Sequence, residues 1–393
     1  MNIRQFLGTS LPTAAPHRNG VPDRIKLLFF IDTGLSGGGA ERVLCNLVNA
    51  LDQNRFDITV ATLWPEDVEK FLAPHIHYQS LYPAKNALLR TLYRLESQLG
   101  TAVRRIKGNF DIEVAYLECG STKLMSASKS SAKKVAWVHC DLTLMADDAD
   151  AFVRQTSPWY ETFDHVVCVS ESVRESFRKL YCDRFPCSVL YNVNDEAEIL
   201  RKADAFTPEG SDVPTLCAVG RLSPEKDFLH LLRACSRLNQ EYIPYRLQII
   251  GEGQERPQLE EFIKRKKLED SVQLLGWQNN PYPYMRNADI IVCSSRYEGL
   301  STVITEALIL GKAVVTTPCG GMGELLGNSE HGLIAGAADD DLYNSLKKML
   351  TEPGLMEHYA AAAALRGRYF RRDALVGRHE AFFTELLEGT NKQ

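Results

Sequence analysis

Short apolar runs alternate along this chain with longer segments that have the periodicity of amphipathic helices. In the first half these runs predict strands at 25–31, 57–63, 111–117, 134–138 and 165–169. In the second half they predict strands at 215–219, 246–250, 271–275, 288–293, 312–317 and 332–334. Apolar runs without polar alternation are typical of parallel strands buried on both faces. The pattern therefore predicts an α/β protein with two doubly wound Rossmann-like domains that face each other across a cleft.

Polar segments suggest where these domains begin and end. Residues 1–22 contain Pro, Gly and Thr without the apolar region of a signal peptide, so we expect a flexible tail. Residues 23–200 form the predicted first domain and residues 215–372 the second. Residues 201–214 are polar and predict a linker. The last segment, 373–393, predicts a helix that crosses back to the first domain.

Composition narrows the class of protein. The chain has 393 residues, of which 45% are hydrophobic and 24% charged, as in ordinary globular proteins. A net charge of −5 gives no reason to expect nucleic acid as a partner. Ten cysteines without a C-x-x-C motif predict reduced thiols in a cytoplasmic protein. Cys182 and Cys187 are close enough in sequence to leave a disulfide or oxidation open.

Residues 87–107 predict one long helix with leucines along one side and several arginines. A basic amphipathic helix of this kind can lie on an anionic membrane surface. The alternative is a helix whose apolar face packs on the core and whose basic face is solvated. The sequence leaves peripheral contact with the cytoplasmic membrane face open.

The most informative stretch is 294–306, where a buried strand is followed by a tight loop and the start of a helix. Free N–H groups near Leu300 and Ser301 favour an anion such as phosphate, and Gly299 allows the backbone to approach a ligand closely. Glu298 and Glu306 flank this position, and their carboxylates are better suited to sugar hydroxyls than to phosphate. The alternative is two ordinary exposed glutamates.

A second cluster follows the first strand of the second half. Gly220 turns the chain, and Arg221 and Lys226 project from the loop, as expected for binding a diphosphate. The alternative is a pair of surface cations. Gly251 and the loop at Trp277 follow the next two strands and extend the predicted site.

In the first half, Gly37, Gly38 and Gly39 lie between a strand and a helix, where backbone N–H groups can accommodate a phosphate or a sugar. The loop lacks the G-x-G-x-x-G pattern of dinucleotide-binding enzymes. His139 and Asp141 follow the strand at 134–138 and are expected at the rim of the crevice. No D-x-D metal motif occurs at a crevice position, so no metal is predicted.

Together these motifs resemble the retaining GT-B glycosyltransferases of family 4, from Gly34 to about Glu385. The most specific part is the E-x7-E motif of Glu298 and Glu306, followed by the Gly220–Lys226 segment. The resemblance implies that Glu298 contacts the donor sugar and Glu306 the ribose, and that Arg221 and Lys226 neutralise the diphosphate. It places His139 near the reacting sugar and the glycine loop over donor or acceptor.

The resemblance also places Trp277 and Gln278 in the loop that binds the base. One departure concerns Asn192, because the glycine that often follows this asparagine in the family is replaced by valine. The loops of the first domain look like those of members that build bacterial surface polysaccharides.

The implied activity is transfer of a sugar from a nucleoside-diphosphate sugar, with UDP favoured, to a hydroxyl of a glycan or lipid-linked acceptor. The expected catalytic residues are His139, Glu298, Arg221 and Lys226, without a metal or other cofactor. Two alternatives stay open at this point. One is an epimerase or glycan phosphorylase on the same fold, and the other is a non-catalytic protein that binds nucleotide sugars.

Overall fold

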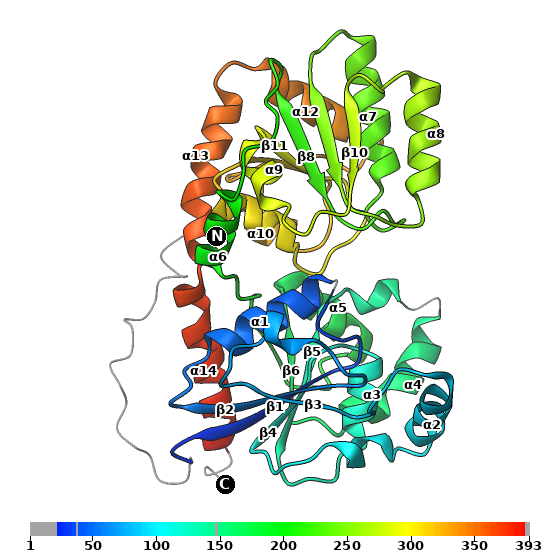
Figure 1. Cartoon of the computed structure of the whole chain (residues 1–393), viewed down its shortest axis with the longest axis vertical. Coiled ribbons are helices and arrows are strands. Elements are labelled where there is room, and N and C mark those ends of the chain that lie inside the picture. The colour runs from blue at the N-terminus through cyan, green and yellow to red at the C-terminus, as the bar shows by residue number, and fades with distance from the viewer. Residues whose placement is uncertain (1–21, 37, 146–147, 390–393) are drawn as a thin grey trace.

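The computed structural model describes residues 22–36, 38–145 and 148–389, which form two lobes stacked one above the other (Figure 1). The predicted tail, residues 1–22, lies outside this part of the chain except for its last residue. Gly37 and residues 390–393 lie outside it as well.

The first domain contains a seven-stranded parallel sheet with the order β3-β2-β1-β4-β5-β6-β7. Its strands are β1 (Ile25–Ile31), β2 (Phe56–Thr62), β3 (His77–Ser80), β4 (Ile112–Ala115), β5 (Lys133–Val138), β6 (His165–Cys168) and β7 (Cys187–Val189). Its helices are α1 (Gly39–Ala50), α2 (Ala87–Gln98), α3 (Gly120–Ser126), α4 (Ala149–Tyr160) and α5 (Glu171–Tyr181). All residues of β1 except Lys26 are buried, as expected for a central strand covered on both faces.

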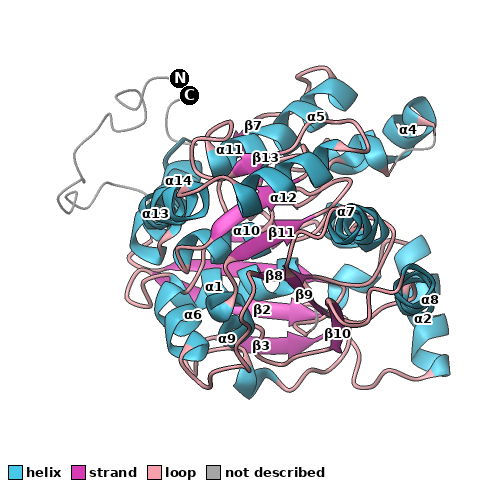
Figure 2. Ribbon diagram, turned by 90° about the horizontal axis from the view of Figure 1, so that it is seen from above, coloured by secondary structure: helices cyan, strands magenta, loops and turns pink. Residues whose placement is uncertain are grey.

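The second domain contains a six-stranded parallel sheet with the order β10-β9-β8-β11-β12-β13. Its strands are β8 (Thr215–Val219), β9 (Arg246–Ile250), β10 (Val272–Gly276), β11 (Ile290–Cys293), β12 (Ala313–Thr316) and β13 (Leu333–Ile334). Its helices are α7 (Phe228–Gln240), α8 (Arg256–Lys266), α9 (Tyr282–Asn287), α10 (Thr302–Ile309), α11 (Met322–Leu326), α12 (Asp341–Thr351) and α13 (Leu355–Gly367). Seen from above, the strands lie among surrounding helices (Figure 2).

The predicted α/β fold with two doubly wound domains is confirmed, since both sheets are parallel and each reverses its order beside its first strand. Each strand expected from the sequence is present, and both of its ends lie within two residues of the predicted ones. The predicted series lacks the two short strands β3 and β7, neither of which has a buried residue.

The single helix predicted at 87–107 is wrong. Helix α2 ends at Gln98, Gly100 adopts a positive φ of 66°, and a short 3₁₀ segment follows at Ala102–Arg105. Glycine commonly ends a helix in this way because it adopts left-handed backbone angles without a steric cost. The two pieces therefore do not share one continuous apolar face.

The segment predicted as a linker, 201–214, begins inside the last turn of α6 (Glu196–Ala203). This helix packs against α9 and α10, so it travels with the second domain. The side chain of Asn280 reinforces the contact by donating a hydrogen bond to the carbonyl oxygen of Lys202 at 2.8 Å. The irregular connection is therefore shorter than its polar composition indicated.

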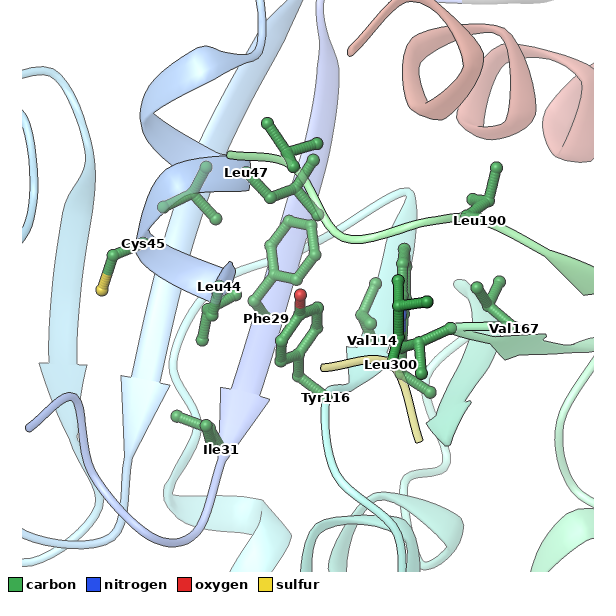
Figure 3. Packing of buried hydrophobic residues seen from close by; sticks show 14 of the residues in the cluster. Phe29, Ile31, Leu44, Cys45, Leu47, Val114, Tyr116, Val167, Leu190 and Leu300 are labelled. Atoms are coloured by element: carbon green, nitrogen blue, oxygen red, sulfur yellow. The ribbon is translucent and has the colours of Figure 1, made fainter. Parts of the chain in front are cut away.

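The last helix, α14 (Arg372–Glu388), packs on the first domain although it follows the second in sequence (Figure 1). Phe383 is fully buried and makes edge-on ring contacts with Phe29 of β1 and Phe56 of β2. Leu300, from the second domain, also lies in the cluster around Phe29 and Tyr116 (Figure 3). Apolar packing thus joins the two domains beside the loop that carries Glu298.

Candidate functional site

The loops after β8 and β11 meet where the strand order of the second sheet reverses. Such a reversal opens a crevice at the carboxyl ends of the strands, and ligands of doubly wound sheets bind there. The Ser294 hydroxyl donates to the carbonyl oxygen of Lys226 at 2.8 Å. Arg296 binds the carboxylate of Asp227, also at 2.8 Å. These contacts fix the two loops against each other.

Lys226 and Glu298 form an ion pair at this crevice. Lys226 Nζ lies 2.6 Å from Glu298 Oε1, and Ser295 donates to the same oxygen at 2.7 Å. Burial lowers the pKa of Lys226, but the nearby Glu298 carboxylate more than offsets this and the net shift is upward. Lys226 therefore stays charged at neutral pH. The predicted approach of these two residues is present in the structure.

The loop after Glu298 leads directly into α10. Ser301 caps this helix, and its hydroxyl accepts a hydrogen bond from the N–H of Ile304. A Cβ on Gly299 would lie 1.8 Å from the carbonyl oxygen of His139 in the other domain. Only glycine permits this approach, so Gly299 brings the Glu298 loop against the first domain.

The start of α10 also faces the start of α1. A Cβ on Gly39 would lie 3.5 Å from the hydroxyl of Thr302, so the two helix N-termini approach each other across the domain boundary. Unpaired N–H groups and the positive ends of both helix dipoles favour an anion near this position. Gly38 is the residue that precedes α1 with extended backbone angles, and the predicted glycine loop thus lies beside α10.

Glu306 is only 3% exposed, which excludes the alternative of a solvated helix residue. Its Oε1 lies 3.0 Å from the Arg42 guanidinium of α1 and accepts a hydrogen bond from the Tyr282 hydroxyl, also at 3.0 Å. Burial raises the pKa of Glu306, and Arg42 and Tyr282 oppose this shift. The buried carboxylate is thus held by one cation from the opposite domain and one phenol.

The crevice of the first domain has different chemistry. Asp32, after β1, accepts a hydrogen bond from the Ser121 hydroxyl at 2.6 Å. Burial raises the pKa of Asp32, and the neighbouring Glu118 and Glu41 act in the same direction, while the Ser121 hydrogen bond lowers it. Carboxylates that accept hydrogen bonds suit hydroxyl groups and disfavour phosphate.

His139 lies on this side of the cleft, directly after β5. Its backbone N–H donates to Glu118 Oε2 at 2.9 Å, and its ring packs on Tyr116 with centroids 4.8 Å apart. Burial lowers the pKa of His139 to about 4, so the ring is neutral at pH 7. Its Nε2 is buried without a hydrogen-bond partner among the described residues.

A further contact between the domains holds the cleft together. The carboxylate of Glu324 in α11 accepts hydrogen bonds from the N–H groups of Glu171 and Ser172 at the start of α5, at 2.8 and 2.9 Å. The Ser170 hydroxyl donates to the carbonyl oxygen of Gly299 at 2.8 Å. An acid at a helix N-terminus is favourable, so this contact stabilises the closed arrangement.

Other predicted residues lie around this centre without joining the ion pairs. Arg221 is exposed and bonds neither glutamate in the described part of the chain. Trp277 is 62% exposed. Gln278, which follows the edge strand β10, donates to the carbonyl oxygen of Leu275 in that strand. Gly220 and Gly251 contact each other, since a Cβ on Gly251 would lie 1.8 Å from the Gly220 carbonyl oxygen.

Asp141 and Asn192 have local structural roles. The Asp141 carboxylate accepts hydrogen bonds from the N–H and hydroxyl of Thr143 and so caps a short 3₁₀ segment. Asn192 is buried, and its carbonyl oxygen accepts a hydrogen bond from Asn194. The ten cysteines are free, including Cys182 and Cys187.

Sequence patterns missed Arg42, Tyr282 and Glu324, because each gains its role from a partner far away in the chain. Arg42 occupies a polar position within an ordinary amphipathic helix, and no local motif marks it. Within residues 22–36, 38–145 and 148–389, no three His, Cys, Asp or Glu side chains cluster as metal ligands. No helix in the same ranges is long and apolar enough to cross a bilayer.

Comparison with known proteins gives matches over both domains. Residues 37–198 match the model of Glycosyltransferase Family 4, and residues 201–366 match that of Glycosyl transferases group 1. An N-acetylgalactosamine-N,N'-diacetylbacillosaminyl-diphospho-undecaprenol 4-alpha-N-acetylgalactosaminyltransferase of Campylobacter jejuni is 28% identical, over 89% of this chain and 98% of that protein. The lipopolysaccharide core biosynthesis glycosyltransferase LpsD of Rhizobium meliloti is 25% identical, over 84% of this chain and 91% of that protein.

Among solved structures, HepE of Anabaena in complex with UDP and glucose superposes with a TM-score of 0.74 at 18% identity, covering 92% of this chain and 100% of that one. Sucrose-phosphate synthase of Thermosynechococcus elongatus gives a TM-score of 0.76 at 17% identity, over 93% of this chain and 100% of that one. These likenesses establish the GT-B fold. With family-model matches that cover both domains and divide near residue 200, the chain belongs to the glycosyltransferases of group 1 and family 4 and is a hexosyltransferase.

Proposed function

We propose that this glycosyltransferase moves a sugar from a UDP-sugar to a hydroxyl of a glycan or lipid-linked acceptor in bacterial surface polysaccharide synthesis, with retention of anomeric configuration. The observation that carries the proposal is the meeting of the α1 and α10 N-termini beside the Lys226–Glu298 pair. This arrangement offers positive charge to a diphosphate and a carboxylate to sugar hydroxyls in one place.

In this scheme the second domain binds the donor. Lys226, the start of α10 and the exposed Arg221 stabilise the negative charge that grows on the departing diphosphate. Preorganised groups of this kind are worth roughly 2.7–4 kcal/mol of activation free energy each. Glu298 orients the donor sugar, and Glu306 binds the ribose. No step in the scheme requires a metal or another cofactor.

The first domain presents the acceptor. His139 is neutral at pH 7, so it can exchange hydrogen bonds with a sugar hydroxyl without adding charge. Contact between Gly299 and the His139 carbonyl brings this ring beside the donor loop. Closure of the domains excludes water and so limits donor hydrolysis. Retention is supported by the family resemblance alone, and NMR analysis of the product anomer tests it.

The donor is tested by thermal unfolding with UDP-, GDP- and ADP-sugars, because a ligand that binds the native state raises its apparent stability. We expect UDP-sugars to give the largest upward shift, with and without EDTA. Product analysis with and without an acceptor separates transfer from epimerisation or phosphorolysis. Equal shifts for all three nucleotides, or a shift that EDTA abolishes, would contradict the proposed donor or the metal-free scheme.

We also propose that α2 brings the enzyme to the cytoplasmic face of an anionic membrane. This helix has no buried residue, and Leu88 and Leu95 are 78% and 53% exposed along one edge. Arg90 and Arg94 are exposed along the other edge. A cavity of about 590 Å³ continues from Leu99 and includes Arg104 and Lys129 in its lining. Leucines flanked by cations suit the boundary between acyl chains and anionic headgroups.

Vesicle sedimentation tests this contact. We expect binding to vesicles that contain phosphatidylglycerol and weaker binding to phosphatidylcholine alone. The double variant L88S/L95S should lose most of the binding, and R90Q/R94Q should lose the preference for anionic lipid. The matched control Tyr242→Ser removes a side chain that is 93% exposed on the second domain and should bind normally. Unchanged binding by both double variants would exclude α2 as the membrane surface.

A further inference from the structure

Among the described residues, Arg42 is the one side chain of the first domain that forms an ion pair with an acid of the proposed donor site in the second domain. It extends from α1 to Glu306 in α10, 264 positions later in the chain, and the two side chains lie 3.0 Å apart. The Tyr282 hydroxyl bridges them, accepting from Arg42 at 2.8 Å and donating to Glu306 at 3.0 Å. Three elements, α1, α9 and α10, therefore converge on one carboxylate.

The two oxygens of this carboxylate are not equivalent. Oε1 receives both Arg42 and Tyr282, whereas Oε2 is buried with no hydrogen-bond partner among the described residues. A buried acceptor without a donor is costly, and a carboxylate oxygen is more costly than a neutral one. The arrangement therefore suits a ligand that donates hydroxyl hydrogens to Oε2 while the protein keeps Oε1.

We propose that Arg42 is a positioning residue that couples contact between the domains to recognition of the donor ribose, by holding Glu306 through Oε1 so that Oε2 faces the ribose hydroxyls. This inference rests on the proposed function, since it takes Glu306 as the ribose acid. Arg42 reaches Glu306 only when the first domain lies against the second, so ribose recognition becomes complete on closure. The guanidinium also helps to keep the buried carboxylate ionised.

Calorimetric titration with UDP and 2'-deoxy-UDP tests the coupling. In Arg42→Gln we expect UDP binding to weaken by about tenfold or more, because the buried carboxylate of Glu306 then loses its charged partner. Binding of 2'-deoxy-UDP should change much less, so the preference for ribose falls. Glu306→Gln should lose the same preference, and the double variant should be no worse than Glu306→Gln alone.

The pH dependence of UDP binding provides a second readout. The charged or titratable groups that face Glu306 are Arg42 of α1, Tyr282 of α9 and Lys202 of α6. Loss of the Arg42 charge raises the pKa of Glu306 further, because burial then acts with less opposition. The carboxylate is then protonated at a higher pH, so the acidic limb of binding should move upward in Arg42→Gln and stay near its original position in Arg42→Lys.

Arg55→Gln is the matched control. Arg55 is 46% exposed, close to the 42% of Arg42, and it pairs with Glu380 at 2.6 Å, also between the first domain and a later helix. Arg55 lies outside the cleft, so Arg55→Gln should bind UDP and 2'-deoxy-UDP with unchanged affinities. If Arg42→Gln fails to fold, the preference of Arg42→Lys for UDP over 2'-deoxy-UDP tests the inference instead. We expect this preference to be reduced without being abolished.

Three results would overturn the inference. The first is an unchanged preference for UDP over 2'-deoxy-UDP in Arg42→Gln, and the second is equal weakening of the binding of both nucleotides. The third is tighter binding of UDP, which would show that Arg42 competes with the ribose. A wild-type protein that binds neither UDP nor a UDP-sugar would instead contradict the proposed donor. The two failures are therefore distinguishable in one set of titrations.

Discussion

The two domains share one architecture but present opposite chemistry at equivalent positions. In the second domain the loops at the reversal point bring Lys226 and the start of α10 to the cleft. In the first domain the corresponding loops bring Asp32 and Glu118, with a neutral His139 beside them. Lys226 and the helix N-terminus suit a diphosphate, and the carboxylates of the first domain suit hydroxyl groups. The shared fold therefore supplies two sites, and the loop residues decide which substrate each takes.

The largest loss of turnover should follow from removing either member of the Lys226–Glu298 pair in the second domain. Glu298→Ala and Lys226→Ala should each reduce turnover about a hundredfold or more while leaving the fold intact, since Glu298 orients the donor sugar and Lys226 stabilises the departing diphosphate. Initial rates and circular dichroism measure the two quantities. Lys347→Ala removes another lysine–glutamate pair of the same domain, with Glu241, and should leave turnover unchanged. Full activity of both Glu298→Ala and Lys226→Ala would contradict the role that we assign to the crevice of the second domain.

A smaller loss of turnover should follow from a substitution that pushes the two domains apart at the cleft. Gly299→Ala places a methyl group where the His139 carbonyl oxygen lies 1.8 Å away. Overpacking of this kind costs roughly 1–3 kcal/mol, which corresponds to a loss of turnover of about fivefold to a hundredfold. Gly377→Ala, in α14, has open space around the added group and serves as the control. Equal activity of the two variants would show that close approach of the domains is unnecessary.

The smallest effect should be a pH-dependent change in stability from Asp32. Burial raises its pKa above the ordinary value of 3.8, so the folded state favours the protonated carboxyl. The free energy of unfolding of the native enzyme should therefore fall, relative to Asp32→Asn, as pH rises from about 3.8 through the raised pKa. Urea unfolding of both proteins between pH 3.5 and about 7 measures this difference. A difference that moves in the opposite direction would contradict the acidic character assigned to this crevice.

Much of the fold was predictable because its signals are local. Buried strands such as 215–219 are continuous apolar runs, and the loops after them carry glycine and charge. The Lys226–Glu298 contact followed from the rule that ligand sites lie at the carboxyl ends of neighbouring strands. The sequence resemblance added the roles of those residues, which spacing alone did not provide.

The remaining features depend on packing between distant segments. Nothing near Arg42 indicates that it meets Glu306, and nothing near Glu324 indicates that it caps α5. Asp141 stays a predicted cleft residue because it follows a strand, and no sequence motif indicated that its carboxylate accepts hydrogen bonds from Thr143. The break in the segment 87–107 depends on the backbone of one glycine, whose effect competes with a strong helical periodicity.

The return of α14 to the first domain limits how this chain can be divided. A fragment that ended near residue 200 would retain Phe29 and Phe56 but lose the ring of Phe383 that covers them. Such a fragment would expose an apolar surface and tend to aggregate. Exchange of acceptor domains between relatives by recombination must therefore carry residues 372–388 along with the first domain, so each hybrid gene needs two junctions rather than one.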